Sequence, residues 1–551
     1  MSQPDASDGA QVTAPDQAAW LEGRLPPSVL EGTPRAGGEL VVAIDVEPSS
    51  LNPLIVPDWL GKHLVLGRVV QALVRIDAHD DPEYRIVPEL AERWEVSPDG
   101  RSYTFQLRRG VHWHDGKPFT ARDVIATLDK IRDPSTAAAN ARAEFGELIA
   151  YRAPDDFTVV LEWQRAYFMV LDLLAELPIQ PAHVIAQLSG AQYNEARTNP
   201  LNRSPLGTGP YKFVDWQSQS RIVLARNAHY WGKSPYIDRL VFRVVPDRSV
   251  RLQLAERAEV DFVLRVSADE WQHMDRPVLR QHWHRSRFYG AKYHWIGWNL
   301  QHPLFSDVRV RKALTLLIDR PSIIAKLLYG LPRPTTCNFY WASAACDPAQ
   351  RPWPYDPEEA ARLLDAADVR DHDGDGLRDR AGTQFRFTLT VPSSAGELLR
   401  VAAKIQEDLG HAGIDMRLET LAWSGVLARV RAHQFDATSL VWGGNTHTEP
   451  TSVWHSASIA DASNFIGYRN AEVDRLIDEA RATSDAEVRA GLYRQLGRFL
   501  HEEQPYTFLF VPPELDLLHA RVKGARPSLA WWQFEELWLA EPRAARDSGG
   551  T

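Results

Sequence analysis

The sequence predicts a protein of mixed α and β structure that folds as two or more lobes. Its 551 residues exceed the roughly 250–300 residues that one hydrophobic core usually serves. Apolar residues alternate with polar ones in some segments and recur at helical spacing in others. The two patterns do not follow the regular strand–helix–strand order of a single doubly wound sheet. The predicted fold class is therefore α/β, with helices and strands mixed throughout.

Four segments carry the pattern of strands. An apolar run at Glu39–Ile44 follows two glycines and is broken afterwards by proline and asparagine. In residues 103–107 aromatic and aliphatic side chains alternate with polar ones, as expected of a half-buried strand. Runs rich in aromatic residues at 293–300 and 506–511 predict two more strands.

Helices are predicted where capping residues precede apolar periodicity. Thr120 is typical of an N-cap, and residues 124, 128 and 131 then share one apolar helical face. Asp307 caps a second helix, which ends before Pro321 because proline cannot continue it. Apolar spacing predicts four further helices, at 357–366, 396–412, 471–481 and 486–502.

Composition and charge exclude several classes of protein. With 44% hydrophobic and 24% charged residues, the chain has the composition of a globular protein. Its net charge of -10 argues against nucleic acid as a partner, because phosphate binding needs a basic face. No apolar run approaches the roughly 18–20 residues of a membrane helix.

Residues 1–36 are expected to form a flexible leader. They are polar and rich in proline, alanine, aspartate and glycine, a composition that buries little apolar surface. They show neither the basic start nor the apolar stretch of a secretory signal. Either an export signal was removed, or the protein is not exported, and the sequence leaves this choice open.

The chain has two cysteines, Cys337 and Cys346, in a segment whose prolines indicate a long loop. A local disulfide is expected if the protein lives in an oxidising compartment, and two buried thiols are the alternative. Two cysteines without a nearby histidine pair make a poor zinc site.

Acidic residues alternate with glycine in a second loop. Asp371, Asp373 and Asp375 occupy alternate positions, Gly376 is the sixth residue and Asp379 the ninth, as at the start of an EF-hand loop. The twelfth position is glycine, however, where a calcium loop needs a bidentate glutamate. A structural turn is favoured, with a structural calcium site as the alternative.

Seven short motifs lie along the chain in order: LAERW at 90–94, SPDG at 97–100, RGVHWHDGKPFTA at 109–121, GTGPY at 207–211, YW at 230–231, DVRVRKAL at 307–314 and EPT at 449–451. Together they resemble the extracellular solute-binding protein family 5, which includes dipeptide-, oligopeptide- and nickel-binding proteins of ABC importers. The resemblance extends over roughly residues 38–538.

The resemblance implies a two-lobed, periplasmic-binding-protein-like fold with an enlarged first lobe and two crossing strands at the hinge. The first lobe would comprise residues 37–288 and a C-terminal return at 506–545, with a short tail at 546–551. The second lobe would comprise residues 289–505. Two crossing strands would let the lobes rotate as rigid bodies while few residues change conformation.

The segment VWGGNTHTEPT at 441–451 is the richest candidate for ligand contact. In peptide-binding relatives, an aspartate three residues after the tryptophan pairs with the free ammonium of the peptide. Here that position is Asn445, which accepts hydrogen bonds but carries no charge, so a free-amine peptide ligand is left open. Asp436, Glu449 or another carboxylate could take over the role.

The expected ligand contacts combine this segment with two residues elsewhere in the chain. Tryptophan faces suit peptide side chains, sugar rings or cations, and glycine permits close approach of the backbone. The candidates are Trp442, Gly443, Asn445, Thr446, Glu449, Thr208 and Trp298.

The resemblance implies a binding protein that catalyses nothing and needs no cofactor apart from the calcium alternative. It would capture a peptide-sized ligand between closing lobes and deliver it to the permease subunits of an ABC importer. It would act as a monomer, in the periplasm or extracellularly at the membrane.

Three alternatives remain. The same fold could bind an oligosaccharide, a metal chelate or another small solute, or the chain could be an intracellular sensor. A hydrolase is the third, and the sequence contains no G-x-S-x-G elbow, H-E-x-x-H or P-loop.

Overall fold

The computed structural model describes residues 17–55, 59–77, 84–443, 449–460, 463–527 and 532–541. It divides into two compact units: the first is Met1–Phe288 with Glu514–Thr551, and the second is Tyr289–Pro513. The chain therefore passes from one unit to the other twice, after Phe288 and after Pro513.

A seven-stranded sheet forms one part of the first unit, in the order β12-β21-β11-β1-β10-β9-β8. Strand β1 (Glu39–Ile44) lies between two parallel neighbours and is buried from Leu40 to Ile44. This explains its continuous apolar run, because both faces of such a strand are covered. The other strands are β8 (Tyr211–Gln217), β9 (Arg221–Arg226), β10 (Arg239–Val244), β11 (Phe262–Val263), β12 (Trp283–Phe288) and β21 (Glu514–His519).

A four-stranded antiparallel sheet supports a second core in the same unit. Its order is β4 (Ala91–Val96), β5 (Ser102–Leu107), β7 (Thr158–Trp163) and β6 (Leu148–Asp155). The alternation predicted for residues 103–107 is confirmed, with Tyr103, Phe105 and Leu107 buried. Helix α3 (Ala121–Arg132) contacts this sheet, and its N-terminus is capped where the Thr120 N–H donates to the Asp123 carboxylate at 2.8 Å.

The remaining elements of the first unit are short. They are α1 (Gln17–Glu22), α2 (Trp59–Val65), β2 (Val74–Asp77), β3 (Arg85–Pro88), α4 (Ala139–Glu144), α5 (Val170–Ala175), α6 (Ala182–Ile185), α7 (Gly190–Asn194), α8 (Arg248–Glu256), α9 (Ala268–His273), α10 (Pro277–His282), β22 (Val522–Lys523) and β23 (Trp538–Leu539).

The prediction of a flexible leader is wrong for residues 17–29, while residues 1–16 lie outside the described part. Trp20 in α1 is 2% exposed and lies beneath the guanidinium of Arg285, 5.4 Å from the ring centre. Val29 is fully buried, and Lys523 donates to the carbonyl of Ser28 at 2.9 Å. Two apolar anchors therefore dock this segment despite its polar composition.

A six-stranded sheet organises the second unit, in the order β14-β20-β13-β19-β17-β18. Its central strand β13 (Lys292–Trp298) pairs antiparallel with both neighbours. The other strands are β14 (Arg333–Pro334), β17 (Arg386–Pro392), β18 (Asp415–Leu421), β19 (Ala437–Gly443) and β20 (Tyr506–Val511). A separate hairpin comprises β15 (Asp379–Arg380) and β16 (Thr383–Gln384).

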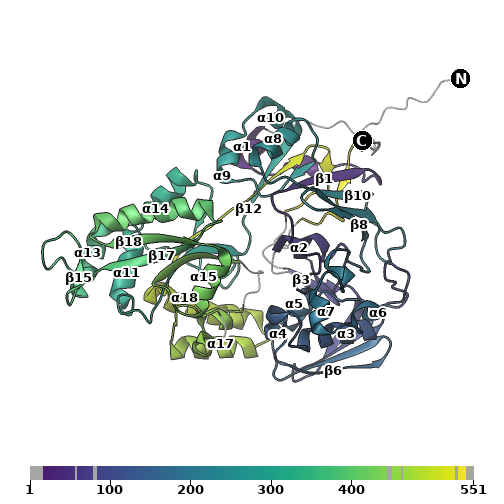
Figure 1. Cartoon of the computed structure of the whole chain (residues 1–551), viewed down its shortest axis with the longest axis horizontal. Coiled ribbons are helices and arrows are strands. Elements are labelled where there is room, and N and C mark those ends of the chain that lie inside the picture. Colours follow the sequence, from purple (N-terminus) through teal and green to yellow (C-terminus); the bar gives the residue numbers. More distant parts are fainter. Residues whose placement is uncertain are drawn as a thin grey trace. The chain divides into compact units, whose positions relative to one another are not determined.

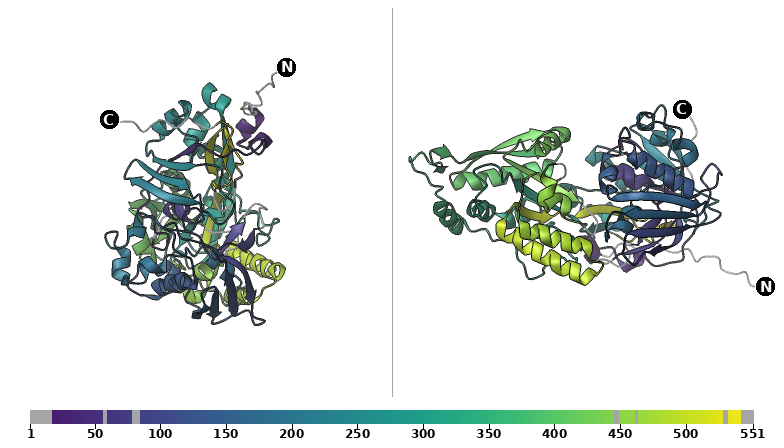
Figure 2. Two further views of the ribbon diagram at one scale, coloured as in Figure 1. Left: turned by 90° about the vertical axis from the view of Figure 1, so that its right-hand side faces the viewer. Right: turned by 90° about the horizontal axis from the view of Figure 1, so that it is seen from below.

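Helices pack around this sheet. Helix α14 (Gly396–His411) contacts β17 and β18 (Figure 1). Helices α17 (Ala471–Ala482) and α18 (Ala486–Glu503) lie side by side (Figure 2). The others are α11 (Val308–Leu317), α12 (Arg320–Ser322), α13 (Pro357–Ala366), α15 (Trp423–Arg431) and α16 (Thr451–Trp454). The helices predicted at 357–366, 396–412, 471–481 and 486–502 are confirmed to within one residue at each end.

One predicted boundary is wrong. The strand at 506–511 was expected to begin the return to the first lobe, but β20 belongs to the second unit. Its Thr507 and Phe508 lie opposite Ile296 and Trp295 of β13. The return begins only with β21, because that is the strand that pairs with β12.

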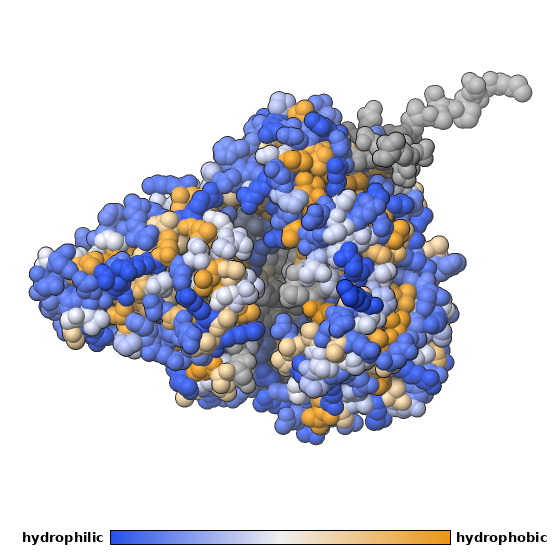
Figure 3. Space-filling model, viewed as in Figure 1, coloured by the Kyte–Doolittle hydropathy of each residue, from blue (hydrophilic) through white to orange (hydrophobic). Residues whose placement is uncertain are grey.

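Hydrophilic residues cover most of the visible surface of both units, and hydrophobic residues occur there in small scattered patches (Figure 3). Among the described residues, no helix combines the length and the apolar character needed to cross a bilayer.

Candidate ligand-binding pocket in the second unit

A cavity of about 180 Å³ lies within the second unit, and five of its twelve described lining residues are aromatic. Its aromatic lining residues are Tyr293, Phe339, Tyr340, Trp442 and Trp454. Three separate parts of the unit supply these residues. They are the six-stranded sheet, the loop 337–346 that the disulfide closes, and helix α16.

Strand register places two of the aromatic residues side by side. Tyr293 of β13 lies directly opposite Trp442 of β19. Opposite residues of an antiparallel pair project from the same face of a sheet. Both side chains therefore reach the cavity from the ends of two neighbouring strands.

A stack of aromatic rings supports Trp442 from behind. Its ring is nearly parallel to those of Trp295 and Phe465, with centres 5.6 and 5.9 Å away. Trp295 in turn stacks on Tyr506, 4.0 Å away at an interplanar angle of 11°. The indole N–H of Trp442 donates to the Tyr506 hydroxyl at 3.4 Å. Burial raises the pKa of Tyr506 well above its usual range, so this hydroxyl stays neutral at physiological pH.

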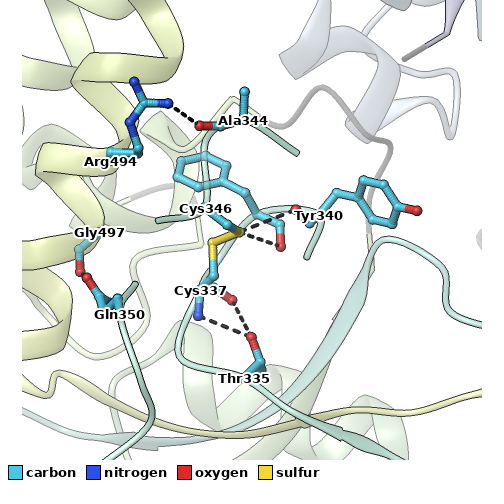
Figure 4. The surroundings of a disulfide bond; sticks show 9 residues. Thr335, Cys337, Tyr340, Ala344, Cys346, Gln350, Arg494 and Gly497 are labelled. Carbon is cyan, nitrogen blue, oxygen red and sulfur yellow. Dashed lines mark hydrogen bonds between the residues drawn. A yellow bond between two sulfur atoms is a disulfide. The ribbon is translucent and has the colours of Figure 1, made fainter. Parts of the chain in front are cut away.

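The disulfide loop, residues 337–346, forms another wall. Cys337 and Cys346 are joined, with Cα atoms 5.8 Å apart, and Asn338, Phe339 and Tyr340 between them line the cavity. Figure 4 shows how the region is held to α18, where Arg494 donates to the carbonyl of Ala344 and Gln350 to that of Gly497. The position of this wall therefore depends on both the disulfide and the helix.

Glu449 is the charged residue of the described cavity wall, and its carboxylate is already paired. Arg481 of α17 donates to one carboxylate oxygen at 3.0 Å. The other oxygen accepts the backbone N–H of Thr451 at 3.0 Å and the Thr451 hydroxyl. Since the side chains of Glu449 and Arg481 are 11% and 13% exposed, the pair is largely withdrawn from water. Glu449 is thus not available as a separate counter-charge for a ligand.

Asp436, the second carboxylate considered from the sequence, lies at the other end of β19. It precedes the strand by one residue, whereas Trp442 is near the strand's end. Six residues of extended chain separate the two by roughly 20 Å. One carboxylate oxygen of Asp436 accepts the N–H of Thr388 at 2.9 Å. This residue therefore does not belong to the cavity.

Thr208 lies in the first unit, where its hydroxyl donates to the side-chain oxygen of Gln71 at 3.0 Å. It is 1% exposed. The preceding Gly207 is needed for packing, since a Cβ there would lie 1.6 Å from the carbonyl oxygen of Val69. The motif at 207–211 thus serves a close backbone crossing within the first unit.

Trp298 belongs to the hydrophobic core of the second unit. It is fully buried, packs against Phe305 and Phe387, and donates its indole N–H to Thr507 at 3.1 Å. We therefore leave it out of the proposed ligand site. Of the remaining candidates, Trp442, Gly443 and Glu449 line the cavity, while Asn445 and Thr446 lie outside the described residues.

The acidic loop brings Asp371, Asp373 and Asp375 together, with ligand-type atoms within 4.8 Å of one another. All three are exposed, and their carboxylates accept backbone N–H groups of the same loop, including Gly374 at 2.7 Å from Asp371. Asp379 is directed elsewhere and accepts from the backbone and ring of His372. These contacts are those of an Asx-type turn, which needs no ion to hold it.

Two residues of the cavity carried no signal for ligand contact in the sequence. Asn338 and Tyr293 are far apart in the chain, and the disulfide loop and the sheet register bring them to the same cavity. Arg481 was placed on a helix, but nothing in the sequence paired it with Glu449.

Two α/β units connected by two chain crossings, with an aromatic cavity in one of them, define the class of the two-lobed solute-binding proteins. Comparison with known proteins agrees. The model of the bacterial extracellular solute-binding proteins, family 5, matches residues 85–464. The oligopeptide-binding protein AppA of Bacillus subtilis is 27% identical over 530 residues, covering 93% of each chain. The dipeptide-binding protein of Escherichia coli is 28% identical over 470 residues, covering 80% of this chain and 83% of that protein.

Solved structures give the same result. AppA from Bacillus subtilis, in complex with a nonapeptide, superposes with a TM-score of 0.78 at 26% identity, covering 92% of this chain and all of that one. NikA from Brucella suis, in complex with Fe(III)-EDTA, has a TM-score of 0.78 at 25% identity over 91% of this chain and 99% of that one. The chain belongs to the bacterial extracellular solute-binding protein family 5, which confirms the resemblance and the fold class predicted from its motifs.

Proposed function

We propose that this member of the family captures a peptide outside the cytoplasm and presents it to the permease of an ABC importer, without chemical change to the ligand. The observation that carries the proposal is the aromatic cavity of the second unit. It is concave, mostly apolar and lined by a few polar groups, as ligand sites usually are. The names of the full-length relatives, oligopeptide- and dipeptide-binding proteins, support the ligand class.

The proposal extends to the protein's state and place. We expect a monomer that acts in the periplasm or at the outer face of the membrane, as befits an extracellular binding family. Ligand contacts made in only one arrangement of the two units would drive the change that the permease recognises.

The test is a thermal-shift screen of ligand-stripped protein. The panel holds randomised pools of di- to pentapeptides, oligosaccharides, and nickel and iron chelates. A ligand at 100 times its dissociation constant adds about 2.7 kcal/mol to the free energy of unfolding. Stabilisation by peptide pools is the expected result, and it should be lost in Trp442→Ala. Stabilisation by sugars or chelates alone would overturn the peptide assignment and keep the family function.

A further inference from the structure

Part of the cavity wall lies inside the loop that the disulfide closes. The chain has two cysteines, and Cys337 is joined to Cys346 (Figure 4). Asn338, Phe339 and Tyr340 follow Cys337 directly and line the cavity. In the described structure these three residues belong to no helix or strand. Their backbone therefore lacks the hydrogen-bonded ladder that holds the sheet wall, and the disulfide is the covalent bond that limits their freedom.

Both ends of the loop are also fixed to α18 by contacts that reduction would leave in place. Before the loop, the Thr336 hydroxyl lies 2.8 Å from Nδ1 of His501. After it, Asp347 pairs with Arg498 at 3.2 Å. Opening the disulfide would therefore free the residues between these contacts without detaching the loop. The freedom gained would be local, because the bridge spans a sequence separation of 9 and short loops gain least when a cross-link opens.

The same loop supports a second wall of the cavity. The indole N–H of Trp341 donates to the carbonyl of Tyr289 at 3.2 Å, and the guanidinium of Arg333 lies over the Trp341 ring, 3.8 Å from its centre. Tyr289 precedes β13 by three residues, and β13 carries Tyr293 of the cavity. A change in the loop would therefore reach the start of β13 as well as the loop's own wall.

The disulfide can exchange with an external dithiol. Both cysteines are half-buried, and the chain holds no third thiol to compete for the bond. A thiolate of the dithiol attacks one sulfur, the S–S bond breaks, and the released cysteine takes up a proton. The second thiol of the reductant then loses its proton and displaces the other cysteine, which is protonated in turn. Two electrons pass to the protein, and the dithiol leaves as a disulfide.

We propose that the Cys337–Cys346 disulfide is a redox switch on ligand binding. The oxidised protein holds its ligand, and reduction by a dithiol weakens binding while both units stay folded. The physical reason is preorganisation: a ligand that meets the reduced loop must order Phe339 and Tyr340 at the expense of its own binding free energy. This inference rests on the proposed peptide-binding function, because it concerns regulation of the same cavity.

The experiment titrates a randomised pentapeptide pool into ligand-stripped protein by calorimetry, before and after treatment with dithiothreitol and without denaturant. Alkylation and mass spectrometry establish that both cysteines are reduced. We expect the reduced protein to bind about tenfold more weakly, and oxidised dithiothreitol to restore the original affinity. Cys337→Ser with Cys346→Ser should bind as the reduced wild type does and should not respond to dithiothreitol, which excludes an effect of the reagent itself.

Hydrogen exchange gives a second measurement that needs no ligand. The N–H of Ser343 donates to the carbonyl of Tyr340 at 2.9 Å, and the N–H of Cys346 to that of Ser343 at 3.1 Å. Both amides should exchange about tenfold faster after reduction, because opening of the loop exposes them to water. Amides within α14 of the same unit are the matched control and should exchange at an unchanged rate.

The outcomes separate this inference from the proposed function. If dithiothreitol leaves the bond intact in the folded protein, or if the reduced protein binds as tightly as the oxidised one, the switch is refuted and peptide binding stands. Loss of the cooperative melting transition on reduction would also refute it, since the loss of binding would then be unfolding. If no pool binds the oxidised protein, the proposed function is wrong, and unchanged exchange at Ser343 and Cys346 would refute the switch independently.

Discussion

Glu89 gives the first unit a pH-dependent stability that can be worked out from its surroundings. The side chain is 5% exposed and accepts two hydrogen bonds, from the amide of Gln71 at 3.0 Å and from the N–H of Ala72 at 2.9 Å. The side-chain oxygen of Gln71 also accepts hydrogen bonds from the Thr208 hydroxyl and the indole N–H of Trp231, each at 3.0 Å. Burial raises the pKa of the Glu89 carboxyl from 4.5 to about 7, although the bonds from Ala72 and Gln71 lower it.

The direction in which stability changes with pH follows from proton uptake. Between pH 4.5 and 7 the folded state holds a proton on Glu89 that the unfolded state has released, so the free energy of unfolding falls as the pH rises. The stabilising contribution is complete below pH 4.5 and is lost as the pH passes through about 7. A shift of about 2.5 units at about 1.36 kcal/mol per unit amounts to about 3 kcal/mol.

Glu89→Gln isolates this contribution, because an amide does not titrate. Replacing one carboxylate oxygen by an NH2 group also disturbs a hydrogen bond, but that loss is the same at every pH. The melting temperature of the variant, measured relative to wild type by calorimetry, should therefore rise between pH 4.5 and 7.5. For a unit of this size the change is on the order of 5 °C.

The matched control is Glu92→Gln, which removes the same formal charge from an exposed side chain paired with Arg93. Its melting temperature relative to wild type should stay level over the same range. A level profile for Glu89→Gln as well would refute the argument, since it would mean that the buried carboxyl titrates as it does in the unfolded chain.

Three further predictions concern the second unit. Arg481→Met should lower the free energy of unfolding by about 2 kcal/mol, less than the roughly 3–5 kcal/mol of a fully buried pair. By freeing the carboxylate of Glu449 it should also improve binding of free-amine pentapeptides, and unchanged binding would contradict the pairing described above. Cys337→Ser with Cys346→Ser should cost about 2.5 kcal/mol in urea unfolding, because the bridge closes a loop with a sequence separation of 9. A loss below about 0.5 kcal/mol would mean that the loop is held by α18 alone. Calcium added after EDTA treatment should move the melting temperature by less than about 1 °C, because the loop Asp371–Asp379 is satisfied by its own N–H groups. A shift of several degrees with calcium but not magnesium would establish an ion site.

The sequence predicted those parts of the fold that depend on local pattern. The apolar run at 506–511 is a strand with the predicted limits, because its residues favour extended structure whatever they pair with. Its assignment to a unit was wrong, because pairing with β13 joins residues more than 200 positions apart. Residues 17–29 of the leader were misjudged for a related reason. Composition is an average over a segment, whereas two buried side chains, Trp20 and Val29, are enough to dock it.

The buried face was predicted correctly for α3, where Val124, Leu128 and Ile131 are buried, but less well for α18. In α18, Val488, Leu492, Leu496 and Phe499 recur at helical spacing, yet Val488 is 52% exposed. The buried side chains are Tyr493, Leu496 and Leu500, and Tyr493 stacks on Phe339 of the disulfide loop. A stripe can be read from spacing, but which face is buried depends on what packs against the helix.

The candidate site shows which of its properties residue identity alone predicts and which require the structure. Asn445 in place of an aspartate removed one negative charge and was visible in the sequence. The pairing of Glu449 with Arg481 was not visible in the sequence, because Arg481 lies 32 positions away on another element. Because Arg481 and Thr451 already occupy the oxygens of Glu449, the carboxylate of the described cavity wall is not free to balance the charge of a ligand ammonium.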